Sequence, residues 1–247
     1  MQRIFMSEPV QSDEVCVYGE EAHHLARVLR MRVGEEFVAS DPSGLDYVCR
    51  ISEINGELVR ASVVCTEKNT AEPPYRVFLY QGMPKGDKTD FIIQKAVELG
   101  VYSVSFVVTE RSVSRPDERS MEKKTERYQR ISESAAAQSG RGYVPGVEFF
   151  CGFKNAVKKA SDADVVLLCY EGGGDKLSAV LSKAKKQFGE DINIAVLIGP
   201  EGGFADAEVE LARASGFEFC TLGGRILRTE TAGSHVLSCI AYEFENC

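Results

Sequence analysis

The feature of this sequence that most restricts its fold is a regular alternation, after residue 76, of short apolar runs with longer amphipathic segments. Runs that lack polar alternation predict strands buried on both faces, and helices between such strands predict a mostly parallel sheet. The sequence therefore predicts an α/β domain over residues 74–247. Its strands are expected at 76–83, 103–109, 164–170, 194–199 and 217–222, and its helices at 87–100, 120–140, 175–187, 205–216 and 229–245.

Residues 1–70 show a different pattern. Short β-rich runs close on Pro, Gly, Asn or polar residues, and one helix signal lies at residues 20–31. The pair Asn55-Gly56 between two such runs predicts a two-residue hairpin. We expect a small β-barrel here, followed by a linker at residues 68–76, which contain a double proline.

Composition limits the class of protein and its location. The 247 residues, 44% hydrophobic and 27% charged, are typical of a folded chain of one or two domains. No apolar run approaches the roughly 18 residues of a membrane span, and the N-terminus lacks the apolar centre of a signal peptide. We therefore expect a cytoplasmic protein with no membrane partner.

Neither the cysteines nor the histidines predict a metal site. The eight cysteines include no C-x-x-C pair and no cysteine–histidine spacing suited to zinc. Most lie inside apolar runs, so we interpret them as reduced residues of the core. The three histidines form no group of ligands either, and no metal is expected.

Glycine-rich segments follow three of the predicted strands. They are EGGGD after residue 170, PEGGF after residue 199 and GGRILRTETAG after residue 222. The carboxyl ends of parallel strands meet at one edge of a sheet, where ligands bind, and glycine lets the backbone approach a ligand closely. This pattern predicts a pocket for a flat heterocycle such as adenine, although tight turns without a ligand are the alternative. The apolar residues expected to cover its faces are Leu197, Leu222, Ile226 and Leu227.

Phosphate binding at a helix start is the competing interpretation of PEGGF. However, the sequence contains no G-x-x-x-x-G-K-[ST] and no G-x-G-x-x-G after the first strand. Glu201 would also place a negative charge beside a phosphate, whereas a carboxylate suits the positive sulfonium of S-adenosylmethionine. S-adenosylmethionine is therefore the expected cofactor.

LIGPEGGF followed by LGGRILRTETA resembles the signature of the SPOUT class of knotted RNA methyltransferases, specifically the RsmE family, which methylates N3 of a uridine in 16S ribosomal RNA. The sequence departs from the family pattern at Gly224, where proline is common, and at Ala137, where an acidic residue is common. Further blocks resemble the family in the family's order: RIF at 3–5, HHLARVLRMRVGE at 23–35, KGDKTDFIIQKAVELGV at 85–101, TERS at 109–112 and AAAQSGRGYVPGV at 135–147.

The resemblance implies an α/β fold, a SPOUT trefoil-knot methyltransferase domain with a mostly parallel sheet, preceded by a PUA-like β-barrel that helps to hold RNA. It also implies a homodimer whose site is completed by both subunits. The glycine-rich segments would then be the loops around S-adenosylmethionine. The implied cofactor-binding residues are Tyr170, Glu171, Leu197, Ile198, Gly199, Pro200, Glu201, Gly202, Gly203, Leu222, Gly223, Arg225, Ile226, Leu227 and Thr231.

Catalysis requires uridine N3 to lose its proton before it attacks the methyl group. The site should therefore hold a base or a cation that stabilises the developing anion. The candidates are Glu201, Arg225, Arg228 and Glu230. We expect Arg228 to stabilise the anion or orient a phosphate, and Glu201 to position the cofactor or the base, with a structural Arg228–Glu230 network as the alternative.

RNA contacts have to come from local patches because the formal net charge is −8. Residues 111–130 have an excess of Arg and Lys over Asp and Glu, although a solvated helix face explains that segment as well. Phosphate contacts are predicted for Arg3, Arg27, Arg30 and Arg32 in the N-terminal domain and for Lys85, Lys88, Arg111, Arg115 and Arg141 in the catalytic domain.

The expected function is methylation of N3 of a specific uridine in 16S ribosomal RNA, with the small ribosomal subunit as partner. Two other classes stay open. An RNA-binding ribosome-assembly module without catalysis would bind RNA and transfer no methyl group. An α/β enzyme acting on a small molecule would turn over without RNA.

Overall fold

The computed structural model describes residues 1–116 and 118–246. The chain divides into two compact units, and the division between Glu72 and Pro73 falls inside the segment predicted to be a linker. Residues 136–144 group with the first unit, although their position in the sequence suggests the second. Their place follows from two contacts: Asn69 Nδ2 donates to the carbonyl of Gly140 at 3.0 Å, and Arg141 pairs with Glu72 at 2.6 Å.

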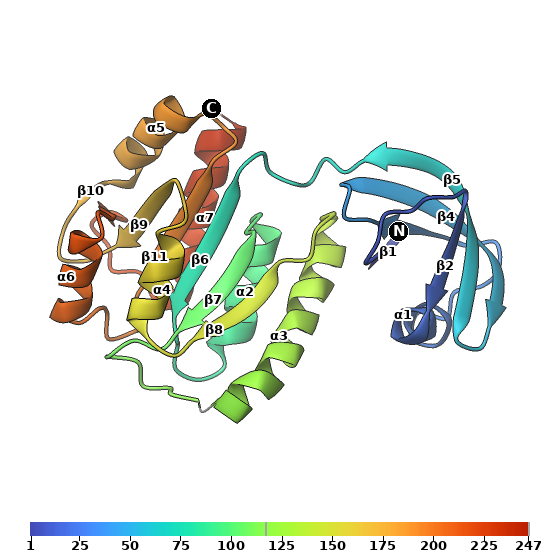
Figure 1. Cartoon of the computed structure of the whole chain (residues 1–247), viewed down its shortest axis with the longest axis horizontal. Coiled ribbons are helices and arrows are strands. Elements are labelled where there is room, and N and C mark those ends of the chain that lie inside the picture. The colour runs from blue at the N-terminus through green and yellow to red at the C-terminus, as the bar shows by residue number, and fades with distance from the viewer. Residues whose placement is uncertain (117, 247) are drawn as a thin grey trace. The chain divides into compact units, whose positions relative to one another are not determined.

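The first unit is an open half-barrel of five strands (Figure 1). Its strands are β1 (Gln2–Phe5), β2 (Glu14–Tyr18), β3 (Glu36–Ser40), β4 (Leu45–Asn55) and β5 (Leu58–Lys68). They lie in the order β1-β3-β4-β5-β2, so the predicted small barrel stays open between β1 and β2. The predicted helix is present as α1 (Gly19–His23), which continues into one π-helical turn, η1 (His24–Val28). Leu25 of that turn is fully buried with Phe37 and Ile51 in the core of this unit.

The predicted hairpin is present but shifted by one residue. Asn55 pairs with Leu58, so the two-residue loop is Gly56-Glu57. Gly56 has φ +60°, and it is the first central residue of the turn, a position at which hairpin turns need positive φ.

The second unit is a parallel sheet of seven strands in the order β10-β12-β9-β11-β6-β7-β8. The strands are β6 (Arg76–Gly82), β7 (Ser103–Val107), β8 (Gly146–Phe150), β9 (Val165–Cys169), β10 (Asp175–Lys176), β11 (Asn193–Ile198) and β12 (Glu218–Thr221). The helices are α2 (Lys88–Glu98), α3 (Glu118–Ser139), α4 (Phe153–Ala160), α5 (Leu177–Phe188), α6 (Asp206–Ala214) and α7 (Thr229–Glu245). All predicted strands and helices of this domain are therefore confirmed.

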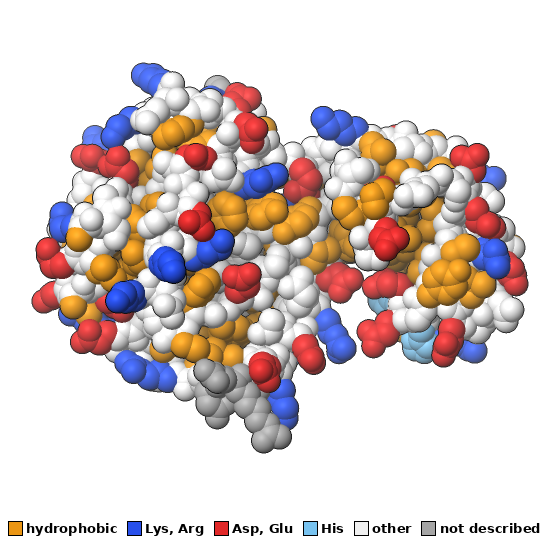
Figure 2. All heavy atoms as spheres, in the orientation of Figure 1, with side chains coloured by type: hydrophobic (Ala, Val, Ile, Leu, Met, Phe, Trp, Pro, Cys, Tyr) orange, Lys and Arg blue, Asp and Glu red, His pale blue; other side chains and the backbone are white. Residues whose placement is uncertain are grey.

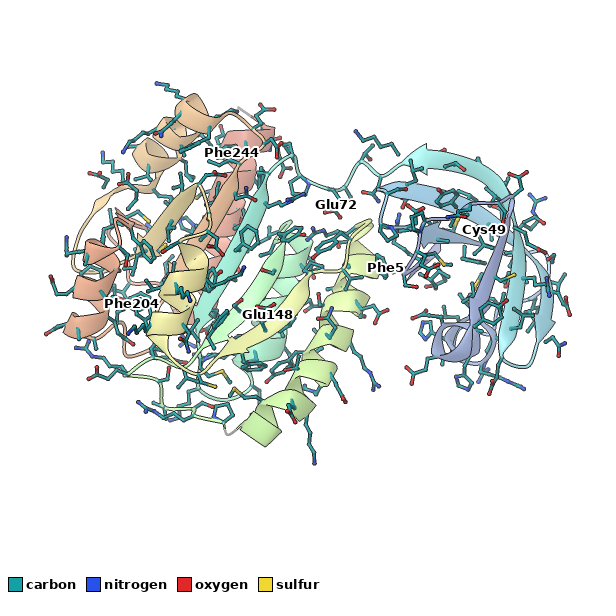
Figure 3. All side chains as sticks on the ribbon, viewed as in Figure 1. Phe5, Cys49, Glu72, Glu148, Phe204 and Phe244 are labelled. Atoms are coloured by element: carbon teal, nitrogen blue, oxygen red, sulfur yellow. The ribbon has the colours of Figure 1, made fainter. Side chains whose placement is uncertain are left out.

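Helices cover both faces of this sheet, which explains the absence of polar alternation in its central strands. On one face α4 packs with α6, and on the other α7 packs with α2 and α5. Side chains of β11 alternate between the two layers, so Leu197 belongs to the α4/α6 core with Phe153 and Phe204. Figure 3 marks Phe204 before α6 and Phe244 near the end of α7.

Three elements of the second unit are missing from the sequence prediction. β8 and the two-residue β10 are short edge strands, beside β7 and β12 respectively. α4 has only eight residues, but Phe153, Ala156, Val157 and Ala160 give it a regular buried face. Eight residues repeat this spacing too few times to predict a helix from the sequence.

Among residues 1–116 and 118–246, no helix is long and apolar enough to cross a membrane. In the same residues, no group of three or more His, Cys, Asp or Glu side chains is placed to hold a metal ion. The cysteines in that part of the chain are unbridged, and Cys49 and Cys220 are buried as predicted. Cys65 and Cys151 are exposed, so their assignment to the core is wrong. Residues 64–68 of β5 are exposed on both faces, and Cys151 lies in the bend after β8.

Candidate active site

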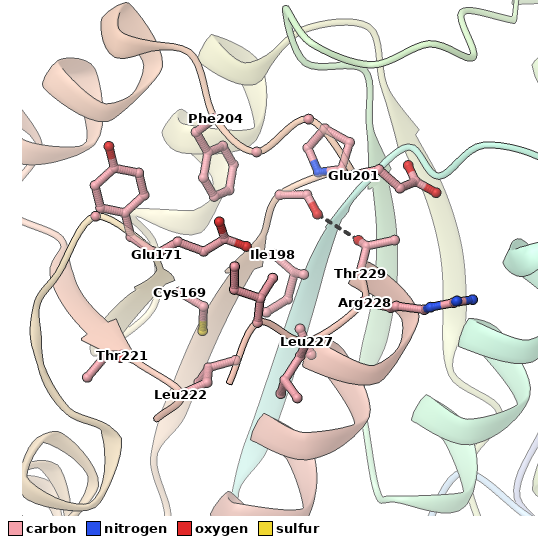
Figure 4. Close-up of a pocket in the computed structure, with 18 of the residues that line it drawn as sticks. Cys169, Glu171, Ile198, Glu201, Phe204, Thr221, Leu222, Leu227, Arg228 and Thr229 are labelled. Atoms are coloured by element: carbon pink, nitrogen blue, oxygen red, sulfur yellow. Dashed lines mark hydrogen bonds between the residues drawn. The ribbon is translucent and has the colours of Figure 1, made fainter. Parts of the chain in front are cut away.

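A cavity of about 860 Å³ lies at the carboxyl ends of β9, β11 and β12 (Figure 4). The chain runs outward from β6 to β7 and β8 on one side and then crosses to β9, β11 and β12 on the other side of β6. This reversal marks the position at which open α/β sheets bind ligands. The lining residues are Lys88, Arg111, Cys169, Tyr170, Glu171, Gly172, Ile198, Gly199, Pro200, Glu201, Gly202, Gly203, Phe204, Thr221, Leu222, Gly223, Gly224, Arg225, Ile226, Leu227, Arg228, Thr229 and Ala232.

The loop after β11 owes its path to two glycines. Gly203 closes a turn by donating its N–H to the carbonyl of Pro200 at 2.9 Å, and it has φ +66°. Gly82, at the end of β6, lies against the same loop, where a Cβ on residue 82 would come within 2.4 Å of Pro200 N. Only a residue without a side chain allows this approach, so Gly82 fixes the distance between β6 and the cavity wall.

Thr229 connects the first turn of α7 to the sheet. Its Oγ1 donates to the carbonyl of Gly199 at 2.6 Å, the bond that Figure 4 marks. The same atom accepts a hydrogen bond from Gln81 Nε2 at 2.7 Å. Because Thr229 is buried, these two bonds hold the ends of β6, β11 and α7 together beneath the cavity.

Glu201 accepts three hydrogen bonds from the segment that leads into α2. The backbone N–H of Lys85 donates to both carboxylate oxygens, at 3.2 Å and 3.3 Å, and Lys88 Nζ donates at 2.7 Å. Burial acts to raise the pKa of Glu201, but these hydrogen bonds outweigh it and lower that pKa below its usual value. Lys88 Nζ also lies 3.1 Å from Glu230 Oε2. The hydrogen bond to Glu201 is the main reason that the pKa of Lys88 is raised.

Arg228 has a different environment. It precedes α7 and is exposed, and its guanidinium makes no hydrogen bond or ion pair with residues 1–116 or 118–246. Glu230 pairs with Lys88 instead, so the alternative of an Arg228–Glu230 network is wrong. Glu201 and Arg228 lie on the same side of the cavity in Figure 4, away from Glu171.

The structure brings most of the predicted site residues together. Arg228 and Glu201 line the cavity, as do all of the predicted cofactor-binding residues except Leu197 and Thr231. The side chain of Leu197 is 1% exposed and points into the α4/α6 core, on the opposite face of β11 from Ile198. Thr231 lies on an exposed side of α7, outside the lining.

Several residues at the cavity were not predicted from the sequence to belong to it. Gly82, Gln81 and Thr229 contribute through contacts between distant segments, and only the LRTETA block hinted at Thr229. Lys88 and Arg111 were predicted as RNA contacts but line the cavity, where Arg111 donates to the carbonyl of Gly202. The other lining residues that were missed are Cys169, Gly172, Phe204, Thr221, Gly224 and Ala232.

The remaining predicted RNA contacts divide into exposed and paired residues. Arg27, Arg30, Arg32 and Lys85 are exposed. Arg115 donates to backbone carbonyls of its own loop. Figure 2 shows basic and acidic side chains intermixed on the visible face of the second unit.

Two predicted RNA contacts are corrected by the structure. The side chain of Arg141 is 3% exposed and its guanidinium is bound by Glu72, so it cannot meet a phosphate at the surface. Arg3 is bound by Asp46 in a pair in which both side chains are at most 15% exposed. In both cases a carboxylate from a segment far away in the sequence forms an ion pair with the arginine, and the sequence does not show that pairing.

The parallel sheet, its cavity and the preceding half-barrel define a class, a two-domain RNA methyltransferase. Sequence profiles agree: the RNA methyltransferase domain matches residues 71–241 and the RNA methyltransferase PUA domain matches residues 17–64. The Bacillus subtilis protein named ribosomal RNA small subunit methyltransferase E is 34% identical and aligns with 99% of this chain and 98% of its own. The chain belongs to the ribosomal RNA small subunit methyltransferase E family.

Solved structures agree with the family. Ribosomal RNA small subunit methyltransferase E from Neisseria gonorrhoeae, bound to S-adenosylmethionine, superposes with a TM-score of 0.83 at 30% identity, covering 98% of this chain and 97% of that one. A Legionella pneumophila protein, solved with S-adenosylmethionine, gives a TM-score of 0.82 at 27% identity, covering 97% and 96%. The predicted fold class, a mixed α/β methyltransferase domain preceded by a PUA-like domain, is confirmed.

Proposed function

We propose that this chain transfers a methyl group from S-adenosylmethionine to N3 of one uridine in 16S ribosomal RNA of the small subunit. The observation that carries the proposal is the cavity, in which three glycine-rich loops meet an arginine that has no partner in the described chain. Relatives named for small-subunit rRNA methylation and solved with this cofactor support it.

The lining of the cavity fits S-adenosylmethionine. Its volume of about 860 Å³ is within the range of small-molecule sites. Backbone groups around Gly199 and Gly223 can bind the edge of an adenine, while Ile198 and Leu227 offer apolar contact to its faces. Glu171 adds a carboxylate suited to a positive sulfonium. When bound, the cofactor would supply an electrophilic methyl group.

The two catalytic candidates have different roles in this proposal. Uridine N3 becomes a nucleophile only after its proton leaves, and an unpaired cation lowers the free energy of the resulting anion. Arg228 supplies that cation. Glu201 is held ionised by Lys88 and by the Lys85 amide, which suits a carboxylate that positions the loop rather than one that takes a proton.

RNA contacts are proposed for the predicted basic residues that the structure leaves exposed. These are Arg27, Arg30 and Arg32 in the first unit and Lys85 in the second, with Arg111 at the cavity. Phosphate contacts of this kind position an RNA without reading its sequence. We further propose that the protein acts in the cytoplasm, where small subunits are assembled.

A homodimer is part of the proposed function. A second, mainly apolar hollow of about 760 Å³ lies between α5 and α7, and its lining includes Leu181, His235 and Tyr242. Tyr242 is 65% exposed. An apolar face beside a ligand site supports association with another copy, which would bring residues of both subunits to the cavity.

The test is transfer of labelled methyl from S-adenosylmethionine to small ribosomal subunits that lack the modification, with the nucleoside identified by mass spectrometry. We expect 3-methyluridine at one position. Arg228→Ala should lower kcat by about 100- to 1000-fold, the usual cost of removing one group that stabilises an anion, while cofactor affinity measured by calorimetry stays unchanged. Arg213→Ala, on α6 outside the cavity, is the control. Cofactor binding without any methyl transfer would contradict the proposal.

A further inference from the structure

Lys88 occupies a position at which a positive charge is unfavourable unless nearby negative charges compensate it. It is the first residue of α2, where the helix dipole disfavours a positive charge. Two carboxylates offset this: Glu201, from the loop after β11, and Glu230, from the first turn of α7, lie 2.7 Å and 3.1 Å from Nζ. One ammonium group therefore joins three segments at the cavity.

The charges in this part of the site balance only when Lys88 is present. Lys88 and Arg228 carry two positive charges, and Glu201 and Glu230 carry two negative charges. Lys88 forms an ion pair with both carboxylates but a hydrogen bond with Glu201 alone. Arg228, two residues before Glu230, has no partner in the described chain. Without the ammonium, Glu230 would lose its cation and Glu201 would keep only its bonds from the Lys85 N–H. Both carboxylates would then attract the guanidinium of Arg228.

We propose that Lys88 is a positioning residue that holds Glu201 and Glu230 away from Arg228 and so keeps the Arg228 guanidinium available to the substrate anion. The proposal rests on the proposed function. It assigns Lys88 a role in the transition state rather than in phosphate binding, since the side chain is 30% exposed and both of its contacts are carboxylates of the site.

The experiment compares Lys88→Met, Lys88→Arg and the double variant Lys88→Met/Glu230→Gln with the wild-type chain in the methyl-transfer assay on unmodified small subunits. Lys88→Met should lower kcat at least about tenfold with little change in KM for S-adenosylmethionine, because the lost interaction matters in the transition state. Lys88→Arg, which keeps the charge, should restore most of kcat. The double variant should recover part of kcat, because it removes one of the released carboxylates.

Lys95→Met is the matched control. Lys95 lies on the same helix and pairs with Glu98 at 2.8 Å, away from the cavity, so its loss should leave kcat unchanged. Thermal unfolding of each variant shows whether it is folded. If the wild type is active and Lys88→Met has an unchanged kcat, the inference about Lys88 is overturned while the proposed function stands. The same follows if the double variant has a kcat no higher than that of Lys88→Met. A wild type that transfers no methyl group would overturn the proposed function and this inference with it.

Discussion

Gly82 is a residue on which the position of the cavity wall depends directly. A Cβ on it would lie 2.4 Å from Pro200 N and 2.5 Å from Pro200 Cδ, well inside van der Waals contact. Gly82→Ala must therefore push the loop after β11 away from β6. We expect it to lower the free energy of unfolding by about 1–3 kcal/mol, as overpacking usually does, and to weaken binding of S-adenosylmethionine in calorimetry.

Gly146→Ala is the control for Gly82→Ala. Gly146 is the first residue of β8 in the same unit, and a Cβ there meets no atom within 4 Å. Its substitution should leave cofactor affinity unchanged. Equal affinities for Gly82→Ala and the wild type would show that the loop position does not depend on residue 82.

At the scale of the elements, a polar cluster joins β1 to β4. Arg3 of β1 binds Asp46 of β4, and that carboxylate also accepts hydrogen bonds from Ser40 Oγ at 2.7 Å and Asn69 Nδ2 at 2.9 Å. Burial acts to raise the pKa of Asp46, but the bonds from Arg3, Ser40 and Asn69 outweigh it and lower that pKa below its usual value. A lowered carboxyl pKa contributes stability above the unfolded-state pKa, and that stability is lost as pH falls through the folded-state pKa.

Asp46→Asn should therefore destabilise the half-barrel by about 1–3 kcal/mol at neutral pH. The difference from the wild type should shrink as pH falls below about 4. Urea unfolding of the full chain at several pH values, with hydrogen exchange at residues 2–5, measures both effects. Glu36→Gln, which breaks the more exposed pair with Arg50, should cost less than about 1 kcal/mol. A constant difference across pH would mean that Asp46 is not the titrating group.

For the whole molecule, the proposed homodimer predicts association through the face between α5 and α7. Tyr242→Asp places a charge on that apolar hollow and should convert a dimer into a monomer, as measured by sedimentation velocity. Tyr18→Asp is a matched control, because Tyr18 is 64% exposed on the first unit and Tyr242 is 65% exposed. A monomeric wild type, or a Tyr242→Asp variant that stays dimeric, would contradict the proposed interface.

Much of this architecture could be predicted from local patterns in the sequence. Apolar runs without polar alternation predicted the buried strands of the second unit, and the glycine-rich segments after them predicted the edge at which the cavity lies. Short elements were harder, because α4 and β8 offer too few residues for their periodicity to stand out. The hairpin was shifted by one residue because its turn type depends on the φ of Gly56 in the folded chain.

The sequence by itself determined the class of fold, the family and the loops that surround the cavity, since each of these depends on patterns within contiguous segments. Only the tertiary structure decided which charges are available. Arg141 and Arg3 are bound inside the first unit by Glu72 and Asp46, and Lys88 is bound at the cavity by Glu201 and Glu230. The physical reason is that a charge is cancelled by whichever opposite charge the fold brings within a few ångströms. Those partners lie far away along the chain.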